Sequence, residues 1–320
     1  METSLNPYIG PMAGITTSVL WTGTSLAFTA AGRRLGPTIV NGTRIFLAIV
    51  FHAVTFRLLT GSWIPDVLGR QVMFLALSGI VGLSIGDQAL FTAFVDVGPR
   101  LAMLVMTAAP LLAALFGWIV LGETLSGLAF LGMAMTVGGV AWVVMERRRP
   151  GLAGTTHHRV RGITLAFVAT VCQAGGLLLS KQGMGHGWLP KEDHLAPQTA
   201  TLLRMVFAGL GMVPILGLHA AREWRRRTNG LLPKYRGSRR TGLMFAALGA
   251  VFGPFLGVWM SLVASDRASL GVAQTLCSLP PVFILPFAVW IYKERIGARA
   301  VGGAILAVAG SAMLFLKPQP

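Results

Sequence analysis

One carboxylate and two guanidinium groups lie inside apolar stretches of the chain, at Asp87, Arg44 and Arg204. A charge at membrane depth costs about 2.5–3.5 kcal/mol even on insertion scales, so such groups pair, face water or take part in transport. We expect Asp87 to be a proton-coupling or substrate-amine site; a packing contact with Gln88 is the alternative. Arg44 and Arg204 are expected to pair with Asp87 or to bind an anionic group of a cargo, unless they extend to the lipid headgroups.

Prolines interrupt two further apolar stretches. Pro110 and the pair Pro280-Pro281 lie mid-stretch, and a proline frees the carbonyl four residues before it, that of Met106 or Cys277. Free backbone groups within a bilayer are tolerated only against protein or a watery cavity. We therefore expect these stretches to bend and to line a path, a static packing kink being the alternative. Other polar side chains that could point inward are Trp21, Thr107, Gln173, Gln274 and Ser278.

These residues sit in a chain too apolar to be water-soluble. Of 320 residues, 54% are hydrophobic and 12% are charged, with a mean hydropathy of +0.68, whereas soluble domains carry about 25% charged residues. A membrane-spanning helix needs about 20 apolar residues. Ten segments qualify: 9–31, 39–59, 71–95, 100–121, 125–145, 161–183, 196–218, 242–264, 268–291 and 297–316. The residues before the first segment include no Lys or Arg, so we expect a retained helix rather than a cleaved signal peptide.

The net charge of +16 does not indicate nucleic-acid binding. The bases cluster between apolar stretches, as in 146–149 and 222–240, where topology-setting charges of membrane proteins belong. Cys172 and Cys277 are too few for a disulfide scaffold or a multi-cysteine metal site. We expect no metal, no cofactor and no nucleic-acid partner.

The second half of the chain repeats the first. At a constant offset of 171 residues, Pro110 meets Pro281, Glu123 meets Glu294, and Gly132 and Gly139 meet Gly303 and Gly310. In the earlier part of each half the offset is smaller than 171 residues. At this smaller offset Arg44 matches Arg204. The change in offset places an insertion at 185–197 in the second half. Since each unit holds five spans, an odd number, consecutive units enter the membrane from opposite faces and the repeats are predicted to be inverted.

The basic residues predict an orientation. Most of the 27 Lys and Arg residues follow the first, third, fifth, seventh and ninth segments, including the basic stretches 146–149 and 222–240. By the positive-inside rule, that side is cytoplasmic and both termini lie outside the cytoplasm.

The ordered motifs resemble the EamA-type repeat of the drug/metabolite transporter superfamily. The first copy is carried by Trp21, the run Thr43-Arg44-Ile45-Phe46-Leu47-Ala48, Pro110, Leu121-Gly122-Glu123-Thr124-Leu125, Gly132 and Gly139. The second copy is carried by Arg204, Pro280-Pro281, Lys293-Glu294-Arg295-Ile296, Gly303 and Gly310. The resemblance implies a ten-helix transporter of small metabolites, often an exporter, with a central cavity and no ATPase part. It also implies termini in the cytoplasm, opposite to the charge distribution.

The expected protein is therefore an all-α integral membrane protein of the cytoplasmic membrane, built from a repeat at 9–145, a basic linker at 146–160 and a repeat at 161–316. We expect a secondary active transporter of a small metabolite or drug-like molecule, an exporter working by alternating access, with protons as candidate coupling ion. It would act as a monomer or homodimer, with lipid and a small-molecule substrate as partners. A non-transporting receptor or scaffold is the alternative. An intramembrane enzyme is disfavoured, because no second acid or histidine accompanies Asp87 in the sequence.

Overall fold

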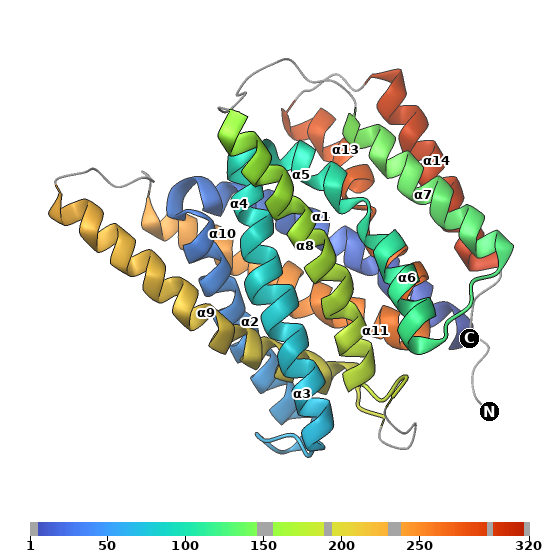
Figure 1. Ribbon diagram of the computed structural model, residues 1–320, viewed down its shortest axis with the longest axis horizontal. Helices are drawn as coiled ribbons and strands as arrows, with labels where there is room; N and C mark the ends of the chain where they lie inside the picture. Colours follow the sequence, from blue (N-terminus) through green and yellow to red (C-terminus); the bar gives the residue numbers. More distant parts are fainter. Residues whose placement is uncertain (1–5, 146–155, 189–193, 230–237, 293–296, 317–320) are drawn as a thin grey trace.

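The computed structural model describes residues 6–145, 156–188, 194–229, 238–292 and 297–316, and these residues form helices and no strand (Figure 1). A helix satisfies every backbone amide within its own segment, as a bilayer requires. Eight helical stretches of the described chain are long and apolar enough to cross a membrane, and the apolar helix Ala298–Leu314 is shorter. The first helix has 27 residues but is not among the eight. The count of ten spans therefore remains a prediction.

The first half of the chain contains η1 (Asn6–Tyr8), α1 (Ile9–Leu35), α2 (Pro37–Thr60), α3 (Gly69–Ser78), the π-helical η2 (Gly79–Gly86), α4 (Asp87–Asp96), α5 (Gly98–Met106), α6 (Ala109–Leu121) and α7 (Gly127–Met145). The second contains α8 (Thr156–Gly183), α9 (Pro197–Thr228), α10 (Arg239–Ala250), the π-helical η4 (Val251–Gly257), α11 (Val258–Arg267), α12 (Leu270–Cys277), α13 (Pro280–Tyr292) and α14 (Ala298–Leu316). The segments α3, η2 and α4 follow one another without a break, as do α10, η4 and α11.

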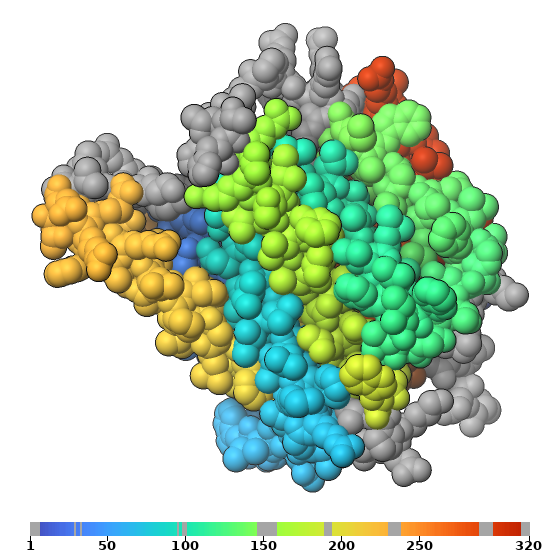
Figure 2. Space-filling view, in the orientation of Figure 1, coloured from blue at the N-terminus to red at the C-terminus, as the bar shows by residue number. Residues whose placement is uncertain are grey.

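Two helices are longer than the apolar pattern predicts. α8 begins at Thr156, inside the stretch 146–160 expected as a linker, and α9 continues to Thr228 instead of ending near 218. Hydropathy marks only the apolar part of a helix. The end of α9 is rich in Ala and Arg, which are good helix formers, and the arginines in its last turn complement the helix dipole. This end projects from the body of the molecule (Figure 2).

The irregular segments occur at equivalent places in the two halves. The π-helical segments end at Gly86 and Gly257, which are related by the same offset of 171 residues as the mid-span prolines. Breaks separate α5 from α6 and α12 from α13, again at equivalent positions. A duplicated sequence has thus produced a duplicated pattern of helix interruptions.

The last helices of the two halves, α7 and α14, pack closely against each other (Figure 1). A Cβ atom on Gly132 would lie 2.9 Å from the carbonyl oxygen of Gly310, and one on Gly139 would lie 2.5 Å from that of Gly303. As one helix advances from 132 to 139, its partner runs back from 310 to 303, so the two helices are antiparallel. Only glycine permits this approach, because any side chain would meet backbone atoms.

Candidate functional site

An ion pair joins α2 to α4 inside the helical bundle. Asp87 is the first residue of α4, directly after η2, and its carboxylate pairs with the guanidinium of Arg44 on α2. The two side chains are 16% and 7% exposed, respectively. Removing two charges from water is costly unless each finds a partner. The expected pairing of Arg44 with Asp87 is therefore present, and Arg44 does not extend to the headgroups.

A chain of polar side chains surrounds the ion pair. Arg44 donates from Nε to Oδ1 of Asn41 at 2.8 Å. Asn41 donates from Nδ2 to Oε1 of Gln88 at 3.5 Å, and Gln88 donates from Nε2 to the hydroxyl of Thr38 at 3.1 Å. Sequence reasoning missed Asn41 and Thr38. Their spacing of three residues along α2, continued by Arg44 three residues later, is the signal that they share a helix face.

Aromatic rings border the same guanidinium. The Cζ atom of Arg44 lies 5.2 Å from the ring centre of Phe91 and 5.9 Å from that of Phe28. The two rings meet edge to face, with centres 6.3 Å apart. Arginine over an aromatic face is attracted by the ring quadrupole, most strongly where water is excluded. These rings therefore hold the arginine in place and leave its remaining donors free to turn toward Asp87 or a ligand.

Arg204 is the second buried guanidinium near Asp87. It lies on α9, is 3% exposed, and its Nε atom has no hydrogen-bond partner among the described residues. Its guanidinium lies against Gly82 and Gly176, where a Cβ would lie 2.8 and 3.3 Å from Nη2. Asp87 is the carboxylate whose charge acts on it. Asp87 is thus in direct contact with Arg44 and acts on Arg204 only through its charge, and Arg204 is too buried to reach the headgroups.

The mid-span prolines mark breaks rather than kinks. α5 ends at Met106 and α6 begins at Ala109, with Pro110 in its first turn; α12 ends at Cys277, and Pro280 begins α13. The first interruption is a two-residue turn at Thr107 and Ala108, which keep right-handed helical dihedral angles, so Leu101–Leu121 is still one span. Proline fits the first turn of a helix, where its missing amide proton is not needed, and it disfavours helical geometry in the residue before it.

Hydroxyl groups satisfy the backbone at these breaks. Thr107 donates to the carbonyl of Leu104 at 2.6 Å, and Ser278 donates to that of Gln274 at 2.7 Å. The two hydroxyls expected to point inward therefore bond their own half-helices. Ser18 of α1, which sequence reasoning missed, donates to Leu276 at 2.6 Å and accepts from the amide of Leu279 at 3.2 Å.

Three other expected residues lie outside the described contacts of the Asp87 site. The indole of Trp21 packs on η4, where a Cβ on Gly257 would lie 2.5 Å from its Nε1. Gln173 is half-buried on α8. Gln274 is 4% exposed on α12. The structure therefore brings together Arg44, Asp87, Gln88 and Arg204 of the residues chosen from the sequence.

A second buried ion pair lies near the α8–α9 connection. Lys181 donates from Nζ to Glu123 at 2.6 Å and to the carbonyl of Ala268 at 2.6 Å. The other carboxylate oxygen of Glu123 accepts the amide of Leu270, at the start of α12, at 2.7 Å. Glu123 thus caps α12 rather than the helix that follows it in sequence. Every partner is satisfied, which is typical of a structural contact.

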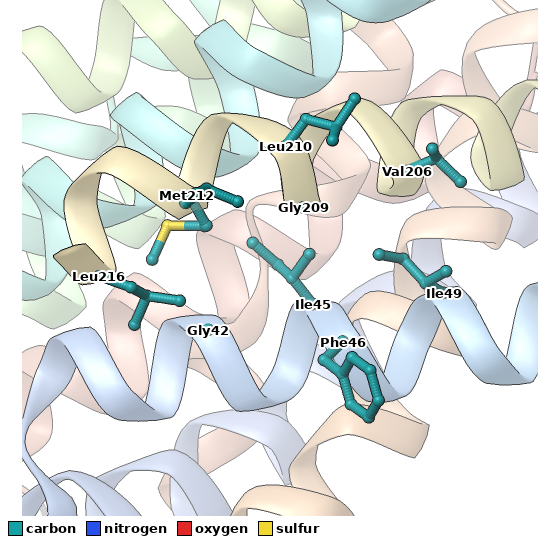
Figure 3. A pocket seen from close by; sticks show the side chains of 10 residues that line it. Gly42, Ile45, Phe46, Ile49, Val206, Gly209, Leu210, Met212 and Leu216 are labelled. Carbon is teal, nitrogen blue, oxygen red and sulfur yellow. The ribbon is translucent and has the colours of Figure 1, made fainter.

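A groove of about 320 Å³ lies between α2 and α9 (Figure 3). Its walls are apolar side chains and glycines, including Ile45, Ile49 and Gly209. Apolar walls suit hydrocarbon and provide no group for polar recognition or proton transfer. Of these two features, the ion-pair cluster is therefore the better candidate for the functional site.

The apolar helices indicate the class of protein, which is a helical membrane protein with several spans. Its internal ion pair places charged groups within those spans. The model of the EamA-like transporter family matches residues 8–145 and 160–316, so the chain belongs to the EamA-like transporter family. Its members are membrane transporters of the drug/metabolite type, not enzymes.

A solved structure titled "Crystal structure of protein" resembles the chain, with a TM-score of 0.74, 18% identity and coverage of 97% of each chain. At this identity the likeness establishes the fold alone. No curated protein matches the sequence.

Proposed function

We propose that the protein is a secondary active transporter that moves a small metabolite across the cytoplasmic membrane by alternating access, with Arg44, Asp87 and Arg204 at its binding site. The observation that carries this proposal is the three-charge cluster beside a π-helical segment, within the spans of a family of transporters. Charged groups retained at membrane depth are usually functional. Export is the direction that the family resemblance favours.

The proposed architecture is ten spans in two inverted repeats, 9–145 and 161–316, joined by 146–160. The antiparallel contact between α7 and α14 supports inversion, because these helices occupy the same place in their repeats. Two equivalent helices that run in opposite directions are what inverted repeats, related by a two-fold axis in the membrane plane, would produce. The matching breaks before Pro110 and Pro280 support hinge or gating roles for the half-helices on either side.

Charge balance indicates the class of cargo. Arg44 and Arg204 contribute two positive charges and Asp87 one negative charge, so an empty cluster carries one excess positive charge where water is scarce. A carboxylate or another anionic group on the cargo would neutralise that excess, and guanidinium groups bind such anions through paired hydrogen bonds. We therefore propose a small metabolite that carries an anionic group.

The charge balance of the cluster would also couple binding of the cargo to binding of a proton. Protonation of Asp87 would release Arg44 from its ion pair and raise the local excess of positive charge. An anionic group would then bind more strongly, so proton and anion would favour each other's binding. If the two bind and leave together they are carried in the same direction, so the outward gradient of the cargo, and not the inward proton gradient, would drive export.

Counterflow in proteoliposomes tests the proposal. Vesicles preloaded with amino acids, short aliphatic carboxylates, the corresponding uncharged amides or cationic dyes would be assayed for accumulation of the labelled compound. At least one carboxylate should accumulate, its amide should not, and Arg44→Gln should lower its uptake at least tenfold. Arg70 is exposed and lies outside the cluster, so the matched control variant Arg70→Gln should transport normally.

Two results would contradict the proposal. If amides and dyes accumulate and carboxylates do not, the cargo is not an anionic metabolite. An absence of counterflow for every class would favour the alternative of a receptor or scaffold, which moves nothing.

A further inference from the structure

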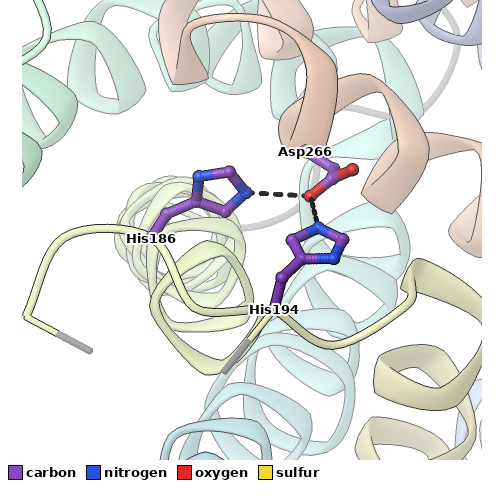
Figure 4. A group of neighbouring side chains, drawn as sticks. All are labelled: His186, His194 and Asp266. Atoms are coloured by element: carbon purple, nitrogen blue, oxygen red, sulfur yellow. Dashed lines mark hydrogen bonds and ion pairs between the residues drawn. The ribbon is translucent and has the colours of Figure 1, made fainter. Parts of the chain in front are cut away.

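Three metal-ligating side chains meet where α8 leads into α9, away from the Asp87 site (Figure 4). His186 and His194 belong to the α8–α9 connection, and Asp266 lies near the end of α11. The Nε2 atom of each imidazole is 2.8 Å from the same carboxylate oxygen, Oδ1 of Asp266. The candidate ligand atoms all lie within 4.8 Å of one another.

The acid is buried and the two imidazoles are accessible. The side chain of Asp266 is 2% exposed, against 31% for His186 and 44% for His194. Arg267 donates from Nε to the other carboxylate oxygen, Oδ2, at 3.1 Å. That contact orients the carboxylate so that Oδ1 faces the imidazoles, the kind of supporting interaction that fixes a metal ligand.

We propose that His186, His194 and Asp266 form a binding site for a divalent transition-metal ion of the Zn²⁺ class. Two imidazole nitrogens and one carboxylate oxygen are a donor set that suits Zn²⁺ and its neighbours and does not suit Mg²⁺ or Ca²⁺, which prefer oxygen ligands alone. Three protein ligands leave a fourth position for water. Sequence analysis predicted no metal site, because the three residues are far apart in the chain and lie at helix ends.

The geometry requires only small side-chain movements to accept the ion. Ligands about 2.0–2.1 Å from a tetrahedral Zn²⁺ ion are separated by about 3.3 Å from each other. The nitrogen-to-oxygen distances of 2.8 Å are slightly shorter than this. Rotation of the two accessible imidazoles opens the space, while Asp266 stays fixed by burial and by Arg267.

The site ties together segments that are distant in sequence. Its histidines lie in the stretch 185–197, the insertion that the first repeat lacks, and Asp266 belongs to the helix that leads into α12. The ends of the connection already meet, since the amide of Leu195 donates to the carbonyl of Met184 at 3.0 Å. A bound ion therefore clamps the connection onto the end of α11. This inference does not depend on the proposed transport function.

Titration of the purified, untagged full-length protein in detergent with ZnCl₂ tests the site. After treatment with a chelator, the protein should bind one ion per chain with micromolar or tighter affinity, and Mg²⁺ should not compete. His186→Ala, His194→Ala and Asp266→Asn should each weaken binding at least tenfold. The matched control His219→Ala removes a histidine of α9 from another part of the chain and should bind as the unaltered protein does.

Two further measurements guard against a variant that fails to fold. His194→Cys supplies a different metal ligand and should retain Zn²⁺, while a thiolate charge-transfer band should appear when Co²⁺ is used. Zn²⁺ should raise the unfolding temperature of the unaltered protein and leave that of Asp266→Asn unchanged. The site is refuted if the unaltered protein binds no ion, or if all three ligand variants bind as tightly as it does.

Discussion

Lys181 and Glu123 form a balanced ion pair, whereas Arg44, Asp87 and Arg204 do not. All three described polar contacts of the Lys181–Glu123 pair are between 2.6 and 2.7 Å, and they join α8 to the start of α12. The Asp87 cluster has one carboxylate for two guanidinium groups, and Nε of Arg204 has no partner among the described residues. Loss of one partner of a balanced buried pair leaves an uncompensated charge, whereas the unbalanced cluster already has an excess charge that a ligand could neutralise.

Removal of Lys181 should therefore destabilise the fold. Lys181→Met leaves the carboxylate of Glu123 buried without its cation, which should lower the free energy of unfolding by about 3–5 kcal/mol. Thermal or denaturant unfolding in detergent measures the effect. The double variant Lys181→Met/Glu123→Gln should recover much of the loss. Arg226→Met, at a partly exposed pair with Glu223 in which Nε and Oε1 are 3.9 Å apart, is the control and should cost less than about 1 kcal/mol. Equal losses at the two sites would show that the buried pair is not structural.

The predictability of the site from the sequence differs among its residues. Asp87, Arg44 and Arg204 could be selected because a charge in an apolar stretch has few explanations. Thr38 and Asn41 could not be selected, because polar uncharged residues are common in helices. Only the structure shows that both side chains bond Gln88. The role of Thr107 and Ser278 stays a prediction for a related reason: each hydroxyl bonds a carbonyl nearby in its own span, and such a bond neither requires nor excludes a cavity.

At the level of helices, the prolines predicted where two spans are interrupted but not how. Pro110 and Pro280 lie in the first turns of new half-helices, so the bend expected within one helix is a short turn between two half-helices of one span. The positions of the spans followed from hydropathy, because about 20 apolar residues are needed to cross the bilayer. The helical extension of α9 to Thr228 could not follow from it, because that segment is charged.

Adjacent glycines of α7 provide a test of the helix contact. A Cβ on Gly139 would lie 2.5 Å from backbone atoms of α14, while one on Gly138 would have no neighbour within 4 Å. Gly139→Val should therefore separate α7 from α14 and lower the unfolding temperature by several degrees, and Gly138→Val should change it little. Thermal unfolding in detergent compares the two variants. Equal stability of the two would mean that the close approach at Gly139 does not form.

At the scale of the molecule, basic side chains collect at the end opposite the histidine cluster. They lie at the start of α8, the end of α9 and the start of α10, and include Arg159, Arg161, Arg225, Arg226, Arg227, Arg239 and Arg240. The positive-inside rule predicts that this end faces the cytoplasm. The histidine cluster and the termini would then be on the outer side.

A reporter at the C-terminus tests this orientation. Alkaline phosphatase fused after Pro320 should be active, because it folds only outside the cytoplasm, and a fluorescent reporter that requires the cytoplasm should be dark. The opposite pair of signals would mean that the family arrangement, with cytoplasmic termini, holds in spite of the charges.

We propose that Asp87 couples a proton to the passage of an anionic metabolite, and transport under a proton gradient measures this coupling. Proteoliposomes would be assayed with the carboxylate identified by counterflow, with and without a pH gradient, for the unaltered protein, for Asp87→Asn and for the exposed control Asp66→Asn. We predict that the gradient changes the steady accumulation of substrate at least tenfold for the unaltered protein and for Asp66→Asn, and not for Asp87→Asn. An unchanged gradient response in Asp87→Asn would contradict the account.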